Sequence, residues 1–173
     1  MKYLTLLRHG KSDWDESYRS DYDRPLKARG RSDAPQMGEY LASLGLVPDL
    51  MVSSPAERAR LTAELFADGV GYDEAIDWEE GIYAASAGEL LAILRRQPDD
   101  ADHLLFVGHN PGFEDLTGYL AGLGQRGATY GVRIPTATAV HLALDVSRWK
   151  DAQAGCGELL WLMTPKMLAR DAD

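Results

Sequence analysis

Short apolar runs alternate along the chain with longer segments in which apolar residues recur every three or four positions. Residues 3–7 form an apolar run that ends shortly before Gly10, and this run predicts a buried strand. Helical spacing then predicts a helix that Gly45 and Pro48 terminate. The apolar positions of this helix are Ala34, Met37, Leu41 and Leu44. The chain therefore begins with a strand followed by a helix.

A second strand and helix follow. Residues 50–54 form another short apolar run, which predicts a strand. The sequence SPAE places Ser54 as a helix N-cap, Pro55 at the first helical position and Glu57 three residues after the cap. The predicted buried face of this helix consists of Leu61, Leu65 and Phe66.

The same order of elements recurs in the second half of the chain. A weak strand at residues 75–78 precedes a helix that begins with a capping box formed by Ser86 and Glu89. The sequence HLLFVGHNP predicts a buried strand and then a helix with Asn110 as its N-cap. Two further runs, TATAVHLAL and GELLWLM, predict the last two strands.

This alternation of strands and helices predicts an α/β fold with helices on both faces of the sheet. We expect a three-layer α/β/α sandwich with a mainly parallel central sheet, in which the last two strands add an antiparallel edge. A chain of 173 residues can bury a sizeable core without disulfides or metals. We therefore expect one domain spanning residues 1–173.

The charge balance restricts the partners. The net charge of −9 opposes nonspecific binding to nucleic acid, which depends on lysines and arginines that neutralise phosphates. A basic site must therefore be local. Between Ser12 and Pro25 the chain is acidic, and we expect a solvated loop there, with a position beside a site as the alternative. Its acidic residues are Asp13, Asp15, Glu16, Asp21 and Asp23.

Cysteine content and hydropathy bear on the compartment. Cys156 is the only cysteine, so it forms no internal disulfide and has no second cysteine with which to hold a metal. The first residues do not resemble a signal peptide, and no apolar stretch has the length of a membrane span. We therefore expect a cytoplasmic protein without a membrane partner.

Basic groups follow three of the predicted strands. Arg8 and His9 follow the first strand, Arg58 lies early in the helix after the second, and His109 follows the strand in VGHNP. Parallel strands end on the same side of a sheet, where ligands bind, and helix N-termini there favour anions. Taken alone, Arg58 is ordinarily a helix-surface residue and His109 a capped loop residue. Together these residues predict a phosphate site.

At this point the sequence resembles the histidine phosphatase superfamily, also called the phosphoglycerate mutase-like family. The motifs that show this resemblance are LRHGKS, SSPAERARLTAE and VGHNP. The segment DRPLKARGRSDA is most similar to the small bacterial phosphohistidine phosphatases. The resemblance implies that His9 attacks phosphorus and becomes phosphorylated before water releases phosphate. It also implies that Arg8 and Arg58 bind phosphoryl oxygens, with a hydrogen bond from His109. No metal or cofactor is expected.

The residue that protonates the leaving group is harder to assign. The mutase branch of the family has an acidic residue shortly before a tyrosine, and EEGIY places Glu80 in a similar setting. Glu80 is therefore the candidate general acid, and an exposed loop carboxylate is the alternative. The candidate substrate-binding residues at the rim are Gly10, Lys11, Ser12, Arg24 and Asn110. Lys11 and Arg24 are otherwise ordinary surface cations, which is the favoured interpretation of Arg24.

We expect the two remaining histidines, His103 and His141, to be edge or core residues. The leading hypothesis is a metal-independent phosphatase that acts on phosphohistidine in a protein or on a small phosphorylated metabolite. One alternative is phosphoryl transfer of the phosphoglycerate mutase type. The other is a phosphate-binding or phosphoprotein-binding module without turnover, although such a module needs no nucleophile. The sequence carries no signal for an oligomeric state.

Overall fold

The first apolar run of the chain forms β1 (Lys2–Arg8), an interior strand of a six-stranded sheet. The computed structural model describes residues 1–15, 17–123 and 131–169, so Glu16 of the acidic segment lies outside the described residues. The strand order is β3-β2-β4-β1-β5-β6. The other strands are β2 (Leu50–Ser53), β3 (Asp77–Trp78), β4 (His103–Gly108), β5 (Ala139–Leu144) and β6 (Gly157–Met163). From β3 to β1 the neighbours are parallel, whereas β5 and β6 form the predicted antiparallel edge.

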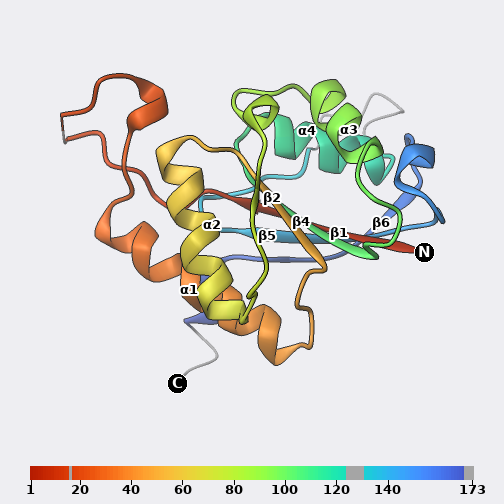
Figure 1. Cartoon of the computed structure of the whole chain (residues 1–173), viewed down its shortest axis with the longest axis horizontal. Helices are drawn as coiled ribbons and strands as arrows, with labels where there is room; N and C mark the ends of the chain where they lie inside the picture. The colour runs from red at the N-terminus through yellow and green to blue at the C-terminus, as the bar shows by residue number, and fades with distance from the viewer. Residues whose placement is uncertain (16, 124–130, 170–173) are drawn as a thin grey trace.

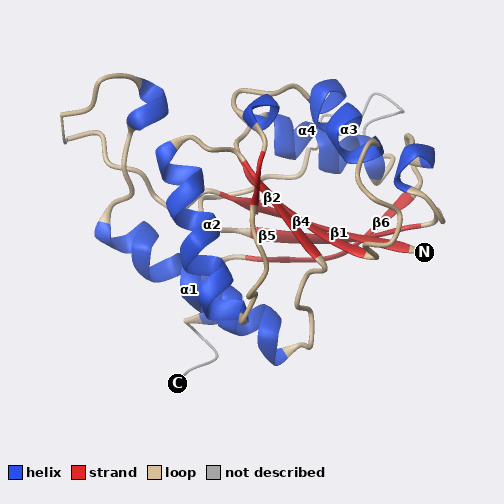
Figure 2. Cartoon of the chain, in the orientation of Figure 1, coloured by secondary structure: helices blue, strands red, loops and turns tan. Residues whose placement is uncertain are grey.

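Helices lie on both faces of this sheet (Figures 1 and 2). The α-helices are α1 (Ala28–Ser43), α2 (Glu57–Val70), α3 (Ala87–Arg95), α4 (Gly112–Leu120) and α5 (Pro165–Leu168). The short 3-10 helices are η1 (Asp21–Asp23), η2 (Glu80–Ile82) and η3 (Trp149–Asp151). One core cluster joins α1 and α2 to the face that contains Leu7, and the other joins α3 and α4 to the face that contains Leu6. The three-layer α/β/α prediction is confirmed.

The helices α1 and α2 pack with their backbones in contact. A Cβ atom added at Gly38 of α1 would lie 2.4 Å from the carbonyl oxygen of Phe66 in α2. A Cβ added at Gly69 of α2 would lie 2.3 Å from the carbonyl oxygen of Pro35 in α1. Only glycine leaves room for this approach. The contact fixes α2, which carries Arg58, against α1.

The connections place a crevice at the C-terminal end of the parallel strands. The chain leaves β1 for α1 on one face of the sheet and leaves β4 for α4 on the other. Strands β1 and β4 are paired neighbours, with Arg8 opposite Gly108. A crevice forms where neighbouring strands lead to opposite faces, and ligands bind there in α/β sheets. Within the described residues, no helix is long and apolar enough to cross a bilayer.

Two of the predicted helix starts are wrong. Helix α2 begins at Glu57 with Ala56 as its N-cap, and α4 begins at Gly112 with Pro111 as its N-cap. The side chains of Ser54 and Asn110 have other partners: Ser54 Oγ lies 3.0 Å from His109 Nε2, and Asn110 Nδ2 donates to the Ile134 carbonyl. The predicted capping box of Ser86 and Glu89 is confirmed.

The buried face of α2 also differs from the prediction. Leu61 and Leu65 are only partly buried, whereas Phe66 is fully buried as expected. The close approach of α1 favours small residues on the contacting face. Its buried residues are Arg58, Ala59, Thr62, Ala63, Phe66, Ala67 and Val70.

Candidate active site

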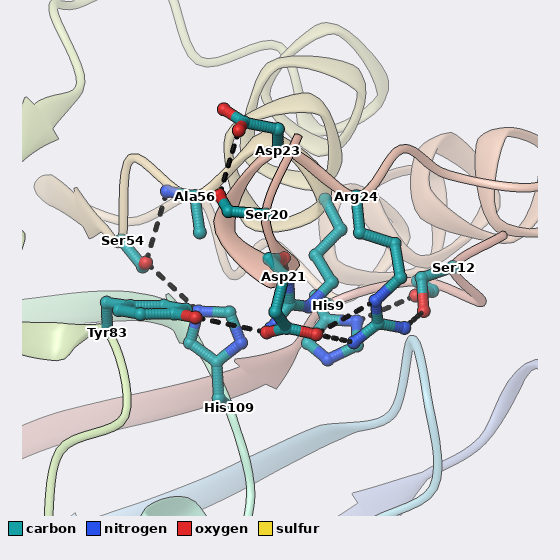
Figure 3. Close-up of polar contacts among 12 residues, drawn as sticks. His9, Ser12, Ser20, Asp21, Asp23, Arg24, Ser54, Ala56, Tyr83 and His109 are labelled. Atoms are coloured by element: carbon teal, nitrogen blue, oxygen red, sulfur yellow. Dashed lines mark hydrogen bonds and ion pairs between the residues drawn. The ribbon is translucent and has the colours of Figure 1, made fainter. Parts of the chain in front are cut away.

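The segments that follow β1, β2 and β4 meet in a pocket with a volume of about 220 Å³, which we call the strand-end pocket (Figure 3). It brings together eight residues that the sequence singled out from four separate motifs. The lining residues are Arg8, His9, Lys11, Ser12, Trp14, Arg24, Arg58, His109, Asn110 and Thr136. Arg8 and Gly108 pair across β1 and β4, so the residues that follow them lie together. The ring centroids of His9 and His109 are 5.1 Å apart.

His9 is held in one tautomer. Its Nδ1 lies 2.8 Å from the carbonyl oxygen of Gly10, and a carbonyl oxygen only accepts hydrogen bonds. Nδ1 therefore carries the proton, and Nε2 keeps a free lone pair. Burial, followed by the charge interaction with His109 and those with Arg58 and Arg8, lowers the pKa of His9 well below 6.5. The ring is thus neutral at physiological pH, as a nucleophile requires.

His109 is oriented by Ser54. Ser54 Oγ accepts from the backbone N–H of Ala56 at 3.3 Å and lies 3.0 Å from His109 Nε2. When the Ser54 hydroxyl donates to Nε2, the proton of the neutral ring is on Nδ1. Burial and the positive charge of Arg58 lower the pKa of His109 to about 3. In this tautomer His109 is a neutral group that can donate one hydrogen bond from Nδ1.

Several buried donors of the strand-end pocket lack a protein partner. Within the described part of the chain, Arg8 Nε, Arg58 Nε and His109 Nδ1 are buried without a hydrogen bond. Buried polar groups are almost always paired, so three unpaired nitrogens around one pocket indicate a site for an anion. Burial lowers the pKa of Arg8, and the nearby carboxylate of Glu114 opposes that shift.

The carboxylate of Asp21 lies between Arg24 and Tyr83 (Figure 3) and also contacts Arg58. Its Oδ2 accepts from Arg58 at 2.9 Å and from the Tyr83 hydroxyl at 3.0 Å, and its Oδ1 lies 2.9 Å from Arg24 Nη2. Burial raises the pKa of Asp21, but Arg58 and the hydrogen bonds from Tyr83 and Arg24 outweigh burial, and the net pKa is lowered. Asp21 is therefore an anion that partly neutralises the guanidinium groups.

Arg24 is not a surface cation, and that favoured interpretation is wrong. Only 6% of the residue is exposed. Its Nη1 donates to Ser12 Oγ, its Nε donates to Asp21 Oδ1, and its guanidinium stacks 3.7 Å from the ring centroid of Trp14. Arg24 is buried because the acidic segment folds back over the site instead of extending into solvent.

The other predicted rim residues divide by exposure. Lys11 is exposed and lines the strand-end pocket, and Asn110 lines it from the β4 side. Gly10 does not line the pocket. Its backbone N–H donates to Thr62 Oγ1 at 2.9 Å, and a Cβ here would lie 2.9 Å from the carbonyl oxygen of Gly30. Gly10 therefore allows the loop after β1 to lie directly against α1.

Glu80 lies in η2 and is exposed. Its two carboxylate oxygens accept from the Tyr22 hydroxyl at 3.2 and 3.0 Å. Tyr22 follows Asp21 in η1, and Tyr83 follows η2. The two short turns are thus joined by hydrogen bonds that link Tyr22 to Glu80 and Tyr83 to Asp21. The assignment of Glu80 as the general acid stays a prediction.

The sequence does not identify five residues of the site. Trp14 and Thr136 line the pocket outside the predicted set. Ser54 is predicted only as a helix cap, Asp21 is one of several acids in a loop, and Tyr83 serves only to locate Glu80. The acidic segment was the only signal for Asp21, and nothing in its pattern distinguished Asp21 from its neighbours. Among residues 1–15, 17–123 and 131–169, no group of three or more His, Cys, Asp or Glu side chains is arranged to hold a metal ion.

Comparison with known proteins assigns the chain to a family. The family model described as the histidine phosphatase superfamily (branch 1) matches residues 4–124. An uncharacterized chloroplast protein of Arabidopsis thaliana is 31% identical over 167 residues, which are 91% of this chain and 73% of that protein.

Two solved structures share the fold along nearly the whole chain. The protein histidine phosphatase SixA complexed with tungstate matches with a TM-score of 0.80 and 23% identity, over 96% of this chain and 99% of that one. A proposed phosphohistidine phosphatase, SixA, from Nakamurella multipartitia matches with a TM-score of 0.74 and 30% identity, over 95% of this chain and 96% of that one.

Proposed function

Because the chain belongs to the histidine phosphatase superfamily, we propose that it is a phosphatase that removes the phosphoryl group from phosphohistidine in a protein. The main support for this reaction is the state of the His9 side chain. Its Nδ1 donates to the Gly10 carbonyl, and its Nε2 is left free in a pocket that also contains unpaired arginine nitrogens. The substrate class is supported by the relative from Nakamurella multipartitia, which bears the name of a phosphohistidine phosphatase.

In the proposed first step, Nε2 of His9 attacks the phosphorus atom of the substrate. A bond forms between Nε2 and phosphorus, and the bond from phosphorus to the substrate imidazole breaks. The electron pair of that bond leaves with the substrate imidazole. In the second step, water attacks phosphorus, and the bond between phosphorus and Nε2 breaks. Its electron pair returns to Nε2, which restores neutral His9, and inorganic phosphate leaves with the oxygen and both protons of the water.

The positive groups of the strand-end pocket stabilise the transferring phosphoryl group. Arg8 and Arg58 each have a free Nε, and His109 has a free Nδ1 that carries a proton in the tautomer set by Ser54. Charge-assisted hydrogen bonds from these groups strengthen as charge develops on the oxygens in the transition state. Arg8 and Arg58 supply positive charge themselves, so we also propose that turnover needs no metal.

The proposal is tested by trapping the phosphorylated protein. Rapid acid-free quenching during turnover of a phosphohistidine peptide, followed by mass spectrometry of proteolytic fragments, is expected to locate the phosphoryl group on His9. His9→Ala is expected to abolish both the trapped species and turnover, with an unchanged circular dichroism spectrum. Turnover by His9→Ala would contradict the mechanism.

The same assay separates the alternatives. A phosphoryl-transfer enzyme of the mutase type would pass the phosphoryl group to an added phosphoglycerate acceptor. A binding module would retain the peptide without releasing inorganic phosphate. Activity that disappears after exhaustive chelation and returns with an added divalent ion would contradict the metal-independent part of the proposal.

A further inference from the structure

Two open grooves extend from the strand-end pocket, and both share Lys11 and Thr136 with it. The first, which we call the Arg133 groove, has a volume of about 460 Å³. It is lined by Arg8, Lys11, Glu114, Arg133, Ile134, Pro135 and Thr136. The second, which we call the Lys166 groove, has a volume of about 370 Å³. It is lined by Lys11, Arg29, Pro135, Thr136, Thr164, Pro165 and Lys166.

The charge of these grooves is opposite to that of the protein. The chain has 27 acidic and 18 basic residues. Among the described charged residues that line the two grooves, Glu114 is the only acid, and the other five are Arg8, Lys11, Arg29, Arg133 and Lys166. Glu114 is engaged, because it accepts a hydrogen bond from the Ile134 backbone at 2.8 Å. The grooves are thus a basic surface on an acidic protein.

The cations of this surface are available to a ligand. Within the described residues, Lys11, Arg133 and Lys166 form no ion pair, and all three are exposed. Arg29 has only a long contact of 3.4 Å with Asp33 on the same helix. Unlike the arginines of the strand-end pocket, these four groups have no internal carboxylate that competes strongly for them.

The positions of these cations favour a protein ligand over a small one. They come from four separate segments: the loop after β1, the start of α1, the segment before β5, and α5. The two grooves together are larger than the strand-end pocket, and they meet at Lys11. A small phosphorylated metabolite with one additional anionic group would engage one groove and leave the other empty.

We propose that the Arg133 and Lys166 grooves bind an acidic surface beside the phosphohistidine of a partner protein. This inference rests on the proposed phosphatase function and adds the chemical character of its substrate. Opposite charges across an interface increase the association rate and set the orientation of the partner. The overall charge of −9 would repel an acidic partner everywhere else, so productive encounters are directed to this surface.

The test uses two synthetic peptides that share a central phosphohistidine. One has glutamate at the flanking positions and the other has glutamine there. We expect kcat/KM of the unmodified protein to be roughly tenfold higher for the glutamate peptide at low ionic strength, which is the lower end of known electrostatic steering. In about 0.5 M salt, where the Debye length is only a few ångströms, the preference is expected to disappear.

Charge-reversal variants test whether the preference for the glutamate peptide arises at the two grooves. The double variant Arg133→Glu and Lys166→Glu changes one cation in each groove and is expected to abolish or invert the preference for the glutamate peptide. Its kcat/KM for free phosphohistidine is expected to stay within about twofold of the unmodified protein. Lys150→Glu is the control for a charge reversal outside the grooves, because Lys150 is an exposed cation of η3 that lines neither groove.

The outcomes distinguish the two proposals. Equal kcat/KM values for both peptides, or a preference that survives in the double variant, would overturn the acidic-surface inference and leave the phosphatase intact. Loss of activity toward free phosphohistidine in the double variant would place these residues in the catalytic site and would also overturn the inference. Failure of the unmodified protein to hydrolyse either peptide or free phosphohistidine would contradict the proposed function itself.

Discussion

The carboxylate of Asp21 occupies hydrogen-bond donors of Arg58 and Arg24, which the phosphoryl group of the substrate would also approach. The carboxylate contacts Arg58 at 2.9 Å and Arg24 at 2.9 Å, and both arginines line the strand-end pocket. A phosphoryl dianion that enters the pocket therefore meets guanidinium groups that already have a partner. Either the carboxylate moves away, or substrate and carboxylate share the same donors at a cost in Coulomb energy.

Asp21→Asn is expected to strengthen the binding of inorganic phosphate by roughly tenfold, since one charge near the pocket is removed while the shape of the side chain is kept. Isothermal titration calorimetry of phosphate, supported by vanadate inhibition, measures this change. Asp23→Asn removes the same charge from an exposed residue of η1 that bonds only Ser20 among the described residues, and serves as the control. Weaker phosphate binding in Asp21→Asn would mean that Asp21 chiefly orients Arg58.

Glu80 is tested by the basicity of the leaving group. Imidazole leaves as a comparatively stable ring, whereas an alkoxide is far more basic and requires a proton. Glu80→Gln is expected to slow hydrolysis of an alkyl phosphate by roughly 100-fold and of phosphohistidine much less. The measurement is the ratio of kcat/KM between variant and unmodified protein for each substrate.

Tyr22→Phe is the companion variant for Glu80, because it removes the hydroxyl that holds the carboxylate and keeps the acid. Equal losses with both substrate classes in Glu80→Gln would indicate positioning. No loss with either substrate would return Glu80 to an exposed loop carboxylate.

At the scale of elements, the close packing of α1 and α2 holds one wall of the strand-end pocket. Arg58 lies in the first turn of α2, and Gly30 of α1 contacts the loop that follows His9. The backbone contacts at Gly38 and Gly69 therefore connect helix packing with the position of a site arginine.

Gly38→Ala is expected to destabilise the fold by about 3 kcal/mol or more, because the added methyl group overlaps backbone atoms that cannot rotate away. It is also expected to weaken phosphate binding, since α2 must shift. Gly88→Ala in α3 is the control: its Cβ meets nothing closer than Ser86 Oγ at 4.0 Å. Helix propensity favours alanine there, so its free energy of unfolding should be equal or up to about 1 kcal/mol higher. Urea unfolding measures both, and equal stabilities would contradict the packing argument.

At the scale of the whole molecule, every histidine is buried with a lowered pKa. Burial is the largest cause for His9, His103, His109 and His141. The predicted assignment of His103 and His141 as edge or core residues is confirmed by their burial, and both rings contact the hydroxyl of Thr5. Burial therefore disfavours the protonated form of all four histidines in the folded protein, whereas the unfolded chain protonates them near pH 6.5.

The sign of the resulting pH dependence follows from proton binding. Below about pH 6.5 the unfolded chain binds more protons than the folded protein. The free energy of unfolding therefore decreases as the pH decreases. The full contribution is present above the unfolded pKa and is lost as the pH falls toward the folded pKa. Each histidine that stays neutral in the folded state contributes a slope of about 1.4 kcal/mol per pH unit.

Urea unfolding at pH 7.5, 6.0 and 5.0 measures this slope before most carboxylates titrate. A free energy of unfolding that does not change between pH 7.5 and 5.0 would mean that the folded protein protonates these histidines.

The low pKa of His9 also predicts that phosphoenzyme formation persists below pH 6, where a free imidazole is mostly protonated.

The sequence by itself determined the layers of the fold and the residues at the strand ends. Hydrophobic periodicity is a local property, and it specifies which face of each strand or helix is buried. Parallel strands end on one side, so motifs that follow β1, β2 and β4 had to meet. This reasoning was sufficient for Arg8, His9, Arg58 and His109, all of which line one pocket.

Only the tertiary structure decided which side chains complete the site. Asp21 contacts Arg58 across 37 positions of sequence and Tyr83 across 62, and no local pattern encodes such contacts. Arg24 is buried for the same reason, since the acidic segment folds back over the pocket. The same holds for Ser54, whose hydroxyl accepts from Ala56 at the start of α2 and also bonds a histidine 55 residues away. Local propensity predicts only the first of these contacts, and the second arises because a buried imidazole must find a partner.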